Sequence, residues 1–225
     1  MDPRIDEAKR RLVRAVRALP RDRQPSPGGP EKDWKEKLSP DWLWDHLLLS
    51  FATWGSSYGA EGLINNAENR SQVEYEKLLA MPFEKRRNHI EPVLRRAKVR
   101  YPEKKALYLA RNVDWIAERG GPARIGEEIL GMEGLKPKTR YLEQLSGIGQ
   151  KYSRNILRDI NDPDATHSIA LDSRFKNVTR TLGLSFSTYE EEERFYLDVA
   201  DELGVLGSML DYSIYENYKE IIDKL

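Results

Sequence analysis

The chain has 225 residues, no cysteine and three histidines, and its 37 lysines and arginines balance its 37 aspartates and glutamates. A chain without cysteine forms no disulfide, thiolate zinc site or cysteine-ligated iron–sulfur cluster, and it suits a reducing cytoplasm. No apolar run approaches the roughly 18 residues of a membrane-spanning helix, and the charged first segment lacks the apolar stretch of a secretory signal. The length allows one substantial core or two small lobes.

The zero net charge argues weakly against a general nucleic-acid binder, which would be expected to carry a basic excess. The charges are unevenly placed, however, because residues 85–111 are strongly basic and residues 190–193 are acidic. A neutral total can therefore conceal a basic face. The alternative interpretation is a highly charged, solvated surface of the kind seen in many heat-stable proteins, and composition does not decide between the two.

Apolar residues recur at three- and four-residue spacings through most of the chain, which predicts helices. The first helix lies in residues 1–19, and the prolines and glycines of 20–33 predict a linker. Ser39-Pro40-Asp41 then supplies a cap and a first-turn proline for a helix over 42–53. Because strand-like alternation is almost absent, the predicted fold class is all-α. The further predicted helices cover roughly 71–80, 83–98, 103–118, 123–131, 138–146, 151–160, 173–182, 188–203 and 208–224.

The most informative stretch is 142–151, Leu-Glu-Gln-Leu-Ser-Gly-Ile-Gly-Gln-Lys. One predicted helix ends at Ser146, two glycines flank Ile148, and a new helix follows at once. Both glycines permit a tight turn and a close backbone approach. The new helix directs its first N–H groups and positive dipole end outward, where a phosphate oxygen can bind. The pattern predicts a phosphate-binding hairpin, with an ordinary helix–helix turn as the alternative.

A second apolar run, Ser168-Ile-Ala-Leu-Asp172, follows the hairpin and precedes another predicted helix. The two segments together resemble the helix-hairpin-helix DNA glycosylases, which include endonuclease III, adenine mismatch glycosylases and 8-oxoguanine glycosylase/lyases. The family pattern is Leu-Pro-Gly-(Val/Ile)-Gly-x-Lys, followed by an apolar run that ends in a catalytic aspartate. In this chain Ser146 replaces the proline. The resemblance covers about residues 40–222, with specific motifs in 142–184 and weaker similarity in 101–115 and 209–222.

This resemblance implies an all-α fold of two helical lobes, with a helix-hairpin-helix motif and an active-site cleft between the lobes. The missing cysteines favour the 8-oxoguanine branch, which has no iron–sulfur cluster, and the helix after Lys151 resembles that of small archaeal-type 8-oxoguanine enzymes. The predicted segments are a helix (1–19), a linker (20–33), a first lobe (34–66 plus 190–225) and a second lobe (67–189) with the hairpin (138–160) and the aspartate segment (168–184).

Lys151 falls where the family's lyases carry their nucleophile, and Asp172 falls at the catalytic aspartate. Cleavage of an N-glycosidic bond leaves an oxocarbenium-like sugar, which a carboxylate near C1′ stabilises. A neutral Lys151 amine could attack C1′ and form a Schiff base, provided that burial or a neighbouring cation lowers its pKa. The alternatives are that Lys151 only contacts phosphate and that Asp172 only caps a helix, the commonest role of an aspartate before a helix.

The remaining site residues are implied by the family pattern. The segment 50–58 matches the position of the wedge that fills the gap left by a flipped base, although it lacks the usual Gln or Asn. The hairpin of this family also holds a monovalent cation, Na⁺ or K⁺, through backbone carbonyls. The implied contacts are Gly147, Ile148, Gly149, Gln150 and Lys151 for DNA; Phe51, Trp54, Asp211, Tyr212 and Tyr215 for the base pocket or wedge; and Glu143, Leu145 and Ile148 for the cation.

The resemblance therefore predicts a base-excision-repair glycosylase with AP-lyase activity and 8-oxoguanine as the favoured base. Its partner is double-stranded DNA that contains a damaged base, with no membrane, and we expect a monomer in a prokaryotic cytoplasm, at the nucleoid. No organic cofactor is expected. A glycosylase for a mismatched adenine, an oxidised pyrimidine or a deaminated base is the alternative enzyme. A non-catalytic DNA-binding hairpin protein is the alternative outside enzymes, and Asp172 argues against it, since a phosphate-binding hairpin alone needs no such aspartate.

Overall fold

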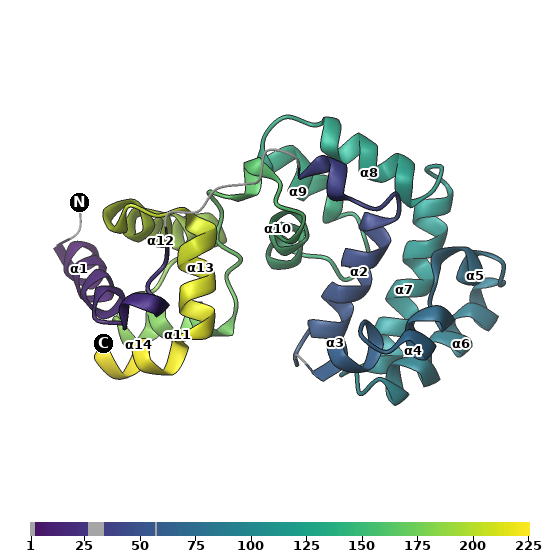
Figure 1. The fold of residues 1–225 in the computed structure, drawn as a ribbon, viewed down its shortest axis with the longest axis horizontal. Coiled ribbons are helices and arrows are strands. Elements are labelled where there is room, and N and C mark those ends of the chain that lie inside the picture. The colour runs from purple at the N-terminus through teal and green to yellow at the C-terminus, as the bar shows by residue number, and fades with distance from the viewer. Residues whose placement is uncertain (1–2, 27–33, 57) are drawn as a thin grey trace. The chain divides into compact units, whose positions relative to one another are not determined.

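The structure, a computed structural model, describes residues 3–26, 34–56 and 58–225. These residues form helices and no β-strand (Figure 1), which confirms the predicted all-α fold. None of these helices is both long enough and apolar enough to cross a membrane. The α-helices are α1 (Pro3–Arg17), α2 (Trp42–Thr53), α3 (Tyr58–Leu63), α4 (Ala67–Gln72), α5 (Tyr75–Leu79), α6 (Phe83–Arg96), α7 (Pro102–Ala117), α8 (Pro122–Gly131), α9 (Leu135–Leu142), α10 (Gln150–Asp159), α11 (Ser173–Thr181), α12 (Tyr189–Leu203), α13 (Gly207–Glu216) and α14 (Tyr218–Lys224).

Most predicted helices match observed ones with small shifts at their ends, but the helix predicted over 138–146 is displaced to Leu135–Leu142 and α3 was not predicted. The predicted helix over 208–224 is instead two helices, α13 and α14, because Asn217 leaves the helical conformation and its side-chain amide donates to the Ser213 carbonyl at 3.0 Å. The predicted helix over 71–80 is likewise divided between α4 and α5. The apolar spacing continues across both breaks, so periodicity alone does not reveal them. Residues 1–2 of the predicted first helix and 27–33 of the linker lie outside the described residues.

The chain forms two compact units. Unit 1 comprises Met1–Trp34 and Ile160–Leu225, and unit 2 comprises Lys35–Asp159. This division differs from the expected lobes, which joined 34–66 to 190–225. The reason is that α2 packs against α3, α8 and α10, all of them within unit 2. Unit 2 therefore holds both helices of the hairpin, α9 and α10, whereas unit 1 holds the aspartate segment.

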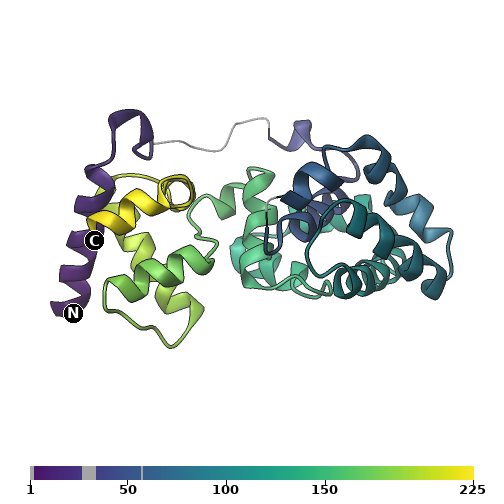
Figure 2. The ribbon, with the colours of Figure 1, turned by 90° about the horizontal axis from the view of Figure 1, so that it is seen from below.

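Unit 1 is built from the two ends of the chain. Helix α1 packs against α12 and α14, and Figure 2 shows this first helix beside the C-terminal helices. The apolar side of α1, including Leu12 and Val16, is fully buried in a core with the aromatic residues of α11 and α12. Phe175 and Tyr196 meet there edge to face, with ring centroids 4.7 Å apart. Burial of one amphipathic face is what makes such a helix stable.

Unit 2 is organised around α2 and the α6–α7 pair, which pack closely against each other. Trp44 of α2 is buried and its indole N–H donates to the Val73 carbonyl at 2.9 Å, so the polar atom of this large side chain is satisfied. Buried Arg86 of α6 donates to the carbonyls of Leu78 and Ala110, both at 2.8 Å. These contacts hold α2 and the α6–α7 pair within unit 2, and α10 of the hairpin packs against α2.

Candidate active site

The hairpin connects α9 to α10, which pack against each other. The Ile148 N–H donates to the Leu145 carbonyl at 3.0 Å, so residues 145–148 close a β-turn. Leu145 and Ile148 are both buried, as expected for an aliphatic residue held between two helices. The predicted hairpin is present with its apolar plug in place.

The two hairpin glycines have different roles. Gly147 has a φ of +85°, and a Cβ atom there would lie 2.7 Å from the Tyr108 ring and 3.0 Å from the Phe51 ring. Gly149 has no positive φ, and a Cβ atom there would meet nothing within 4 Å. The expectation that both glycines serve the turn is therefore correct only for Gly147. Gly149 instead leaves open space in front of α10.

The N-terminal end of α10 faces this open space. Gly149 and Gln150 are exposed, and the Gly149 carbonyl accepts from the Ser153 N–H at 2.9 Å as the helix begins. The first N–H groups of an α-helix have no partner within the helix, and together with the positive end of the helix dipole they favour an anion. The hairpin therefore presents the chemistry of a phosphate site.

Lys151 lies in the first turn of α10 and is partly exposed. Its Nζ is 4.7 Å from the centroid of the Tyr152 ring, and the Tyr152 ring centroid is 6.4 Å from that of Trp54. Trp54 in turn stacks on Tyr108 with an interplanar angle of 3° and a centroid distance of 6.2 Å. The candidate nucleophile thus borders an aromatic cluster formed by Trp54, Tyr108 and Tyr152.

Of the two expected wedge residues in this region, only Trp54 is partly exposed. Phe51 is 1% exposed, and its ring packs near those of Trp54 and Tyr108. A core side chain cannot enter a DNA stack while the fold is intact, so the burial of Phe51 argues against a wedge role. Its helical spacing from Leu47 and Leu48 is that of a core position.

Lys105 is a site residue that the sequence reasoning did not single out. It is 0% exposed, and its Nζ donates to the Phe51 carbonyl at 2.7 Å and to the Trp54 carbonyl at 2.8 Å. Burial, reinforced by the nearby Arg100, lowers the pKa of Lys105 to about 8. The amine satisfies carbonyls at the C-terminal end of α2 and so fixes the backbone that carries Trp54. The available signal was its place in the Tyr-to-Trp helix at 101–115.

Only part of the positive charge in residues 85–111 is exposed and unpaired at the protein surface. Arg86 and Lys105 are buried, and Arg95 is paired with Glu91 and Glu103, both at 2.7 Å. Exposed cations remain in this stretch, Lys85 and Arg111 among them. Part of the predicted basic face is therefore used for internal contacts.

Tyr101 is a second residue that the sequence reasoning left without a role. Its side chain is 58% exposed, and its backbone is left-handed with a φ of 55°. The turn at Gly55 lies beside it, since a Cβ atom on Gly55 would be 3.5 Å from the Tyr101 ring, and Arg100 donates to the Gly55 carbonyl at 2.7 Å. Left-handed backbone at a bulky residue is uncommon and often occurs at functional sites.

In unit 1, the apolar run before Asp172 is held by side chains rather than by a sheet. The N–H of Ile169 donates to Glu193 at 3.0 Å, that of Ala170 to Asp211 at 2.8 Å, and that of Leu171 to the Tyr189 hydroxyl at 2.9 Å. Asp211 is buried, and this contact gives it a positioning role that the sequence did not indicate. Three consecutive backbone groups are thereby fixed immediately before Asp172.

Asp172 caps α11, as predicted. One carboxylate oxygen accepts from the Arg174 N–H at 2.8 Å and from the Phe175 N–H at 3.4 Å. The other oxygen pairs with the Arg174 guanidinium at 2.9 Å. The same guanidinium lies 4.1 Å from the Tyr215 ring centroid. Tyr215 is therefore linked to Asp172 through Arg174, and the carboxylate is oriented on a helix N-terminus.

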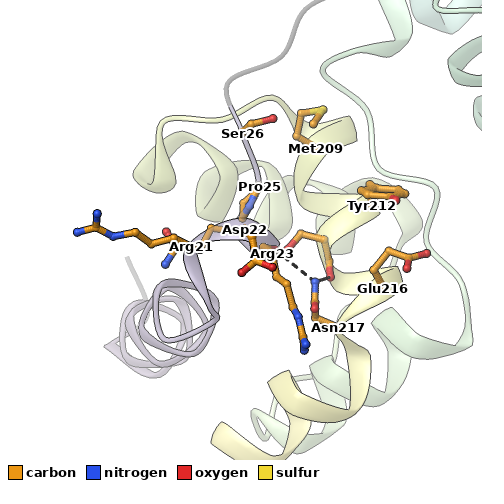
Figure 3. Close-up of a pocket in the computed structure, with 11 residues that line it drawn as sticks. Arg21, Asp22, Arg23, Pro25, Ser26, Met209, Tyr212, Glu216 and Asn217 are labelled. Carbon is orange, nitrogen blue, oxygen red and sulfur yellow. Dashed lines mark hydrogen bonds between the residues drawn. The ribbon is translucent and has the colours of Figure 1, made fainter.

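Tyr212 lies on another face of α13. It is 61% exposed and borders a groove of about 590 Å³ in unit 1 (Figure 3), between α13 and the segment 21–26. Neither Asp211 nor Tyr215 borders this groove. The three residues expected to share a base pocket on α13 thus point to different surroundings: Tyr212 to the groove, Tyr215 to Arg174, and Asp211 into the core.

No family model matches this chain, and no curated protein matches it. Solved structures do match. The 8-oxoguanine DNA glycosylase of Methanocaldococcus jannaschii is 18% identical, with a TM-score of 0.57 over 94% of this chain and 91% of that one. A structure of the M. jannaschii glycosylase/lyase with a 15mer DNA containing 8-oxoguanine matches with the same identity and TM-score over 94% of this chain and 93% of that one. The 8-oxoguanine DNA glycosylase of Thermotoga maritima is 17% identical, with a TM-score of 0.60 over 96% and 92% of the two chains. This chain shares the fold of these 8-oxoguanine DNA glycosylases.

Proposed function

We propose that this protein is a bifunctional DNA glycosylase and AP lyase that removes 8-oxoguanine from double-stranded DNA. One observation carries the proposal: the fold of 8-oxoguanine glycosylases combines here with an exposed helix N-terminus beside Lys151 and an oriented carboxylate at Asp172. The hairpin binds a DNA phosphate, and the damaged nucleotide is flipped out of the stack.

In the proposed reaction, the neutral Lys151 amine attacks C1′ as the bond from C1′ to the base breaks, and the base leaves with a proton. Asp172 stabilises the positive charge that develops on the sugar. The ring then opens to a Schiff base between Lys151 and C1′. Loss of a C2′ proton breaks the C3′–O bond and releases the 3′ phosphate. Lys151 belongs to unit 2 and Asp172 to unit 1.

Two aromatic side chains of unit 2, one partly exposed and one exposed, are candidates for the wedge that fills the gap left by the flipped base. Trp54 was expected from the sequence. Tyr101, whose side chain is exposed and whose backbone is left-handed, is the second candidate. For the cation, the carbonyls of Glu143, Leu145 and Ile148 are the proposed ligands. The Leu145 carbonyl already accepts the Ile148 N–H, and its second lone pair remains available to Na⁺ or K⁺. The proposed setting is a monomer acting on nucleoid DNA in the cytoplasm.

A panel of duplexes, each with one lesion, tests this function. The panel contains 8-oxoguanine, a mismatched adenine, an oxidised pyrimidine, a deaminated base and an undamaged control, and the readouts are base release, strand cleavage and borohydride trapping. We expect 8-oxoguanine DNA to be cleaved and trapped most strongly. Preferred release of another base would reassign the substrate, and binding without any release would identify a non-catalytic DNA-binding protein.

Lys151→Gln is expected to abolish the trapped adduct while DNA affinity stays within a few-fold, because the Schiff base needs an amine. Lys85→Gln, which removes an exposed lysine on α6, is the matched control and is expected to keep the adduct. An undiminished adduct in Lys151→Gln would mean that another amine is the nucleophile.

A further inference from the structure

Ser146 occupies the hairpin position where the resembled family carries proline, and the structure gives its backbone N–H a partner. That N–H donates to Asn112 Oδ1 at 2.7 Å, and the Ser146 carbonyl accepts from Asn112 Nδ2 at 3.1 Å. Asn112 lies on α7 and is fully buried. One side-chain amide thus binds both polar groups of one residue in the turn.

The turn itself explains why proline would fit there. In the β-turn 145–148, Ser146 is the second residue and Gly147, with a φ of +85°, is the third. Ser146 has no positive φ. A negative φ followed by a positive one is the pattern of a type II turn, which favours proline at its second position and glycine at its third. The turn does not itself use the N–H at this second position.

We propose that Asn112 is a positioning residue for phosphate binding, and that the Asn112–Ser146 pair replaces the rigidity that proline would give to the hairpin. The amide anchors the turn to α7, so that the Gly149–Gln150 end of α10 stays at a fixed place in unit 2. The role in DNA binding rests on the proposed function. The anchoring itself does not, because it is a contact within the folded protein.

The proposal makes a reciprocal prediction for two substitutions. Asn112→Leu leaves the Ser146 N–H without its acceptor and the Ser146 carbonyl without its donor, and Ser146→Pro leaves Asn112 Oδ1 without its donor. Each variant alone is therefore expected to weaken binding to an undamaged duplex about tenfold. The double variant removes the N–H and its acceptor together, so that only the carbonyl of residue 146 lacks its former donor, and it places proline where a type II turn favours it. We expect its affinity to return to within about threefold of the original protein.

The four proteins of this cycle are compared by duplex affinity and by melting temperature. Asn69→Leu is the matched control, since Asn69 is a buried asparagine of unit 2 that donates to the Gly62 carbonyl at 2.8 Å, away from the hairpin. In the Asn69→Leu variant, the addition of Ser146→Pro is expected to lower duplex affinity and not to restore it. If Asn112→Leu does not fold, the comparison of Ser146→Pro with the double variant still decides, because adding Asn112→Leu must then improve affinity and melting temperature.

Rescue of affinity and melting temperature by the double substitution supports the positioning role. The positioning role is overturned if both single variants bind the duplex as tightly as the original protein. It is also overturned if the double variant binds as weakly as the single variants. Rescue of melting temperature without rescue of affinity also overturns it, since Asn112 would then serve stability alone. The lesion panel is read separately: a protein that binds duplexes but releases no base contradicts the proposed catalytic function, while the cycle on undamaged DNA still tests Asn112.

Discussion

At the scale of single residues, Asp172 combines a structural and a proposed chemical role that one substitution can separate. Asn caps helices about as well as Asp, so Asp172→Asn should change stability by about 1 kcal/mol or less. The pair with Arg174, in which the Arg174 side chain is 35% and the Asp172 side chain 15% exposed, adds little to that change. Base release should slow about 100-fold or more, because an electrostatic contact in the transition state contributes roughly 3 kcal/mol. Single-turnover release and thermal melting measure the two effects.

The matched control is Asp162→Asn, since Asp162 also caps a helical turn in unit 1, accepting the Asp164 N–H at 2.9 Å. It should leave base release unchanged. Release at the original rate in Asp172→Asn would show that Asp172 is a cap and nothing more.

Lys105 predicts a pH dependence of stability. Its pKa is about 8 in the folded protein and 10.5 when unperturbed, so between these values the unfolded chain binds more protons. Stability contributed by this group therefore rises as pH increases from about 8 to about 10.5, by at most roughly 3 kcal/mol. Urea unfolding of the original protein and of Lys105→Met at pH 7.5 and 10 would reveal it. Parallel pH profiles in the two proteins would contradict the prediction.

At the scale of the hairpin, the two glycines should respond differently to substitution. Gly147→Ala places a side chain at positive φ and against the rings of Tyr108 and Phe51, so it should destabilise the protein by about 2 kcal/mol or more. A Cβ atom at Gly149 would meet no protein atom within 4 Å, so Gly149→Val should leave the melting temperature nearly unchanged. It should weaken binding to damaged and undamaged duplexes alike, because its side chain would occupy the space in front of α10.

Melting curves and duplex affinities of both variants provide the test. Tight binding of undamaged DNA by Gly149→Val would mean that the hairpin is not the DNA anchor.

Helices such as α6, α7 and α12 were predicted from apolar spacing with ends close to the observed ones. The division of 208–224 was missed because Asn217 interrupts the backbone without interrupting the spacing. The Asp172 cap was also predictable, since an aspartate after an apolar run and before a helix is a local signal. The contacts that hold this run, from Glu193, Asp211 and Tyr189, involve residues 18 to 41 positions away.

At the scale of the whole molecule, we expect DNA binding to depend only weakly on salt concentration. The net charge is zero, Arg86 and Lys105 are buried, and Arg95 is paired with a glutamate. With about three phosphates neutralised, affinity should fall about 40-fold between 50 and 200 mM salt. Lys85→Gln should leave this slope unchanged if the hairpin dominates. A fall of about 1,000-fold or more would indicate a broad basic surface instead.

The sequence by itself determined the all-α class, most helix positions, the hairpin and the Asp172 cap, because each depends on residues within a few turns of one another. Tertiary structure decided which segments form each unit. Helix α2 packs against α3, α8 and α10, and the spacing of its apolar residues does not indicate which helices cover it. Tertiary structure also decided the roles of Lys105, which binds carbonyls 51 and 54 residues away, and of Asn112, which binds Ser146 across 34 residues. A buried polar group must find a partner, but only the folded chain determines which distant group it meets.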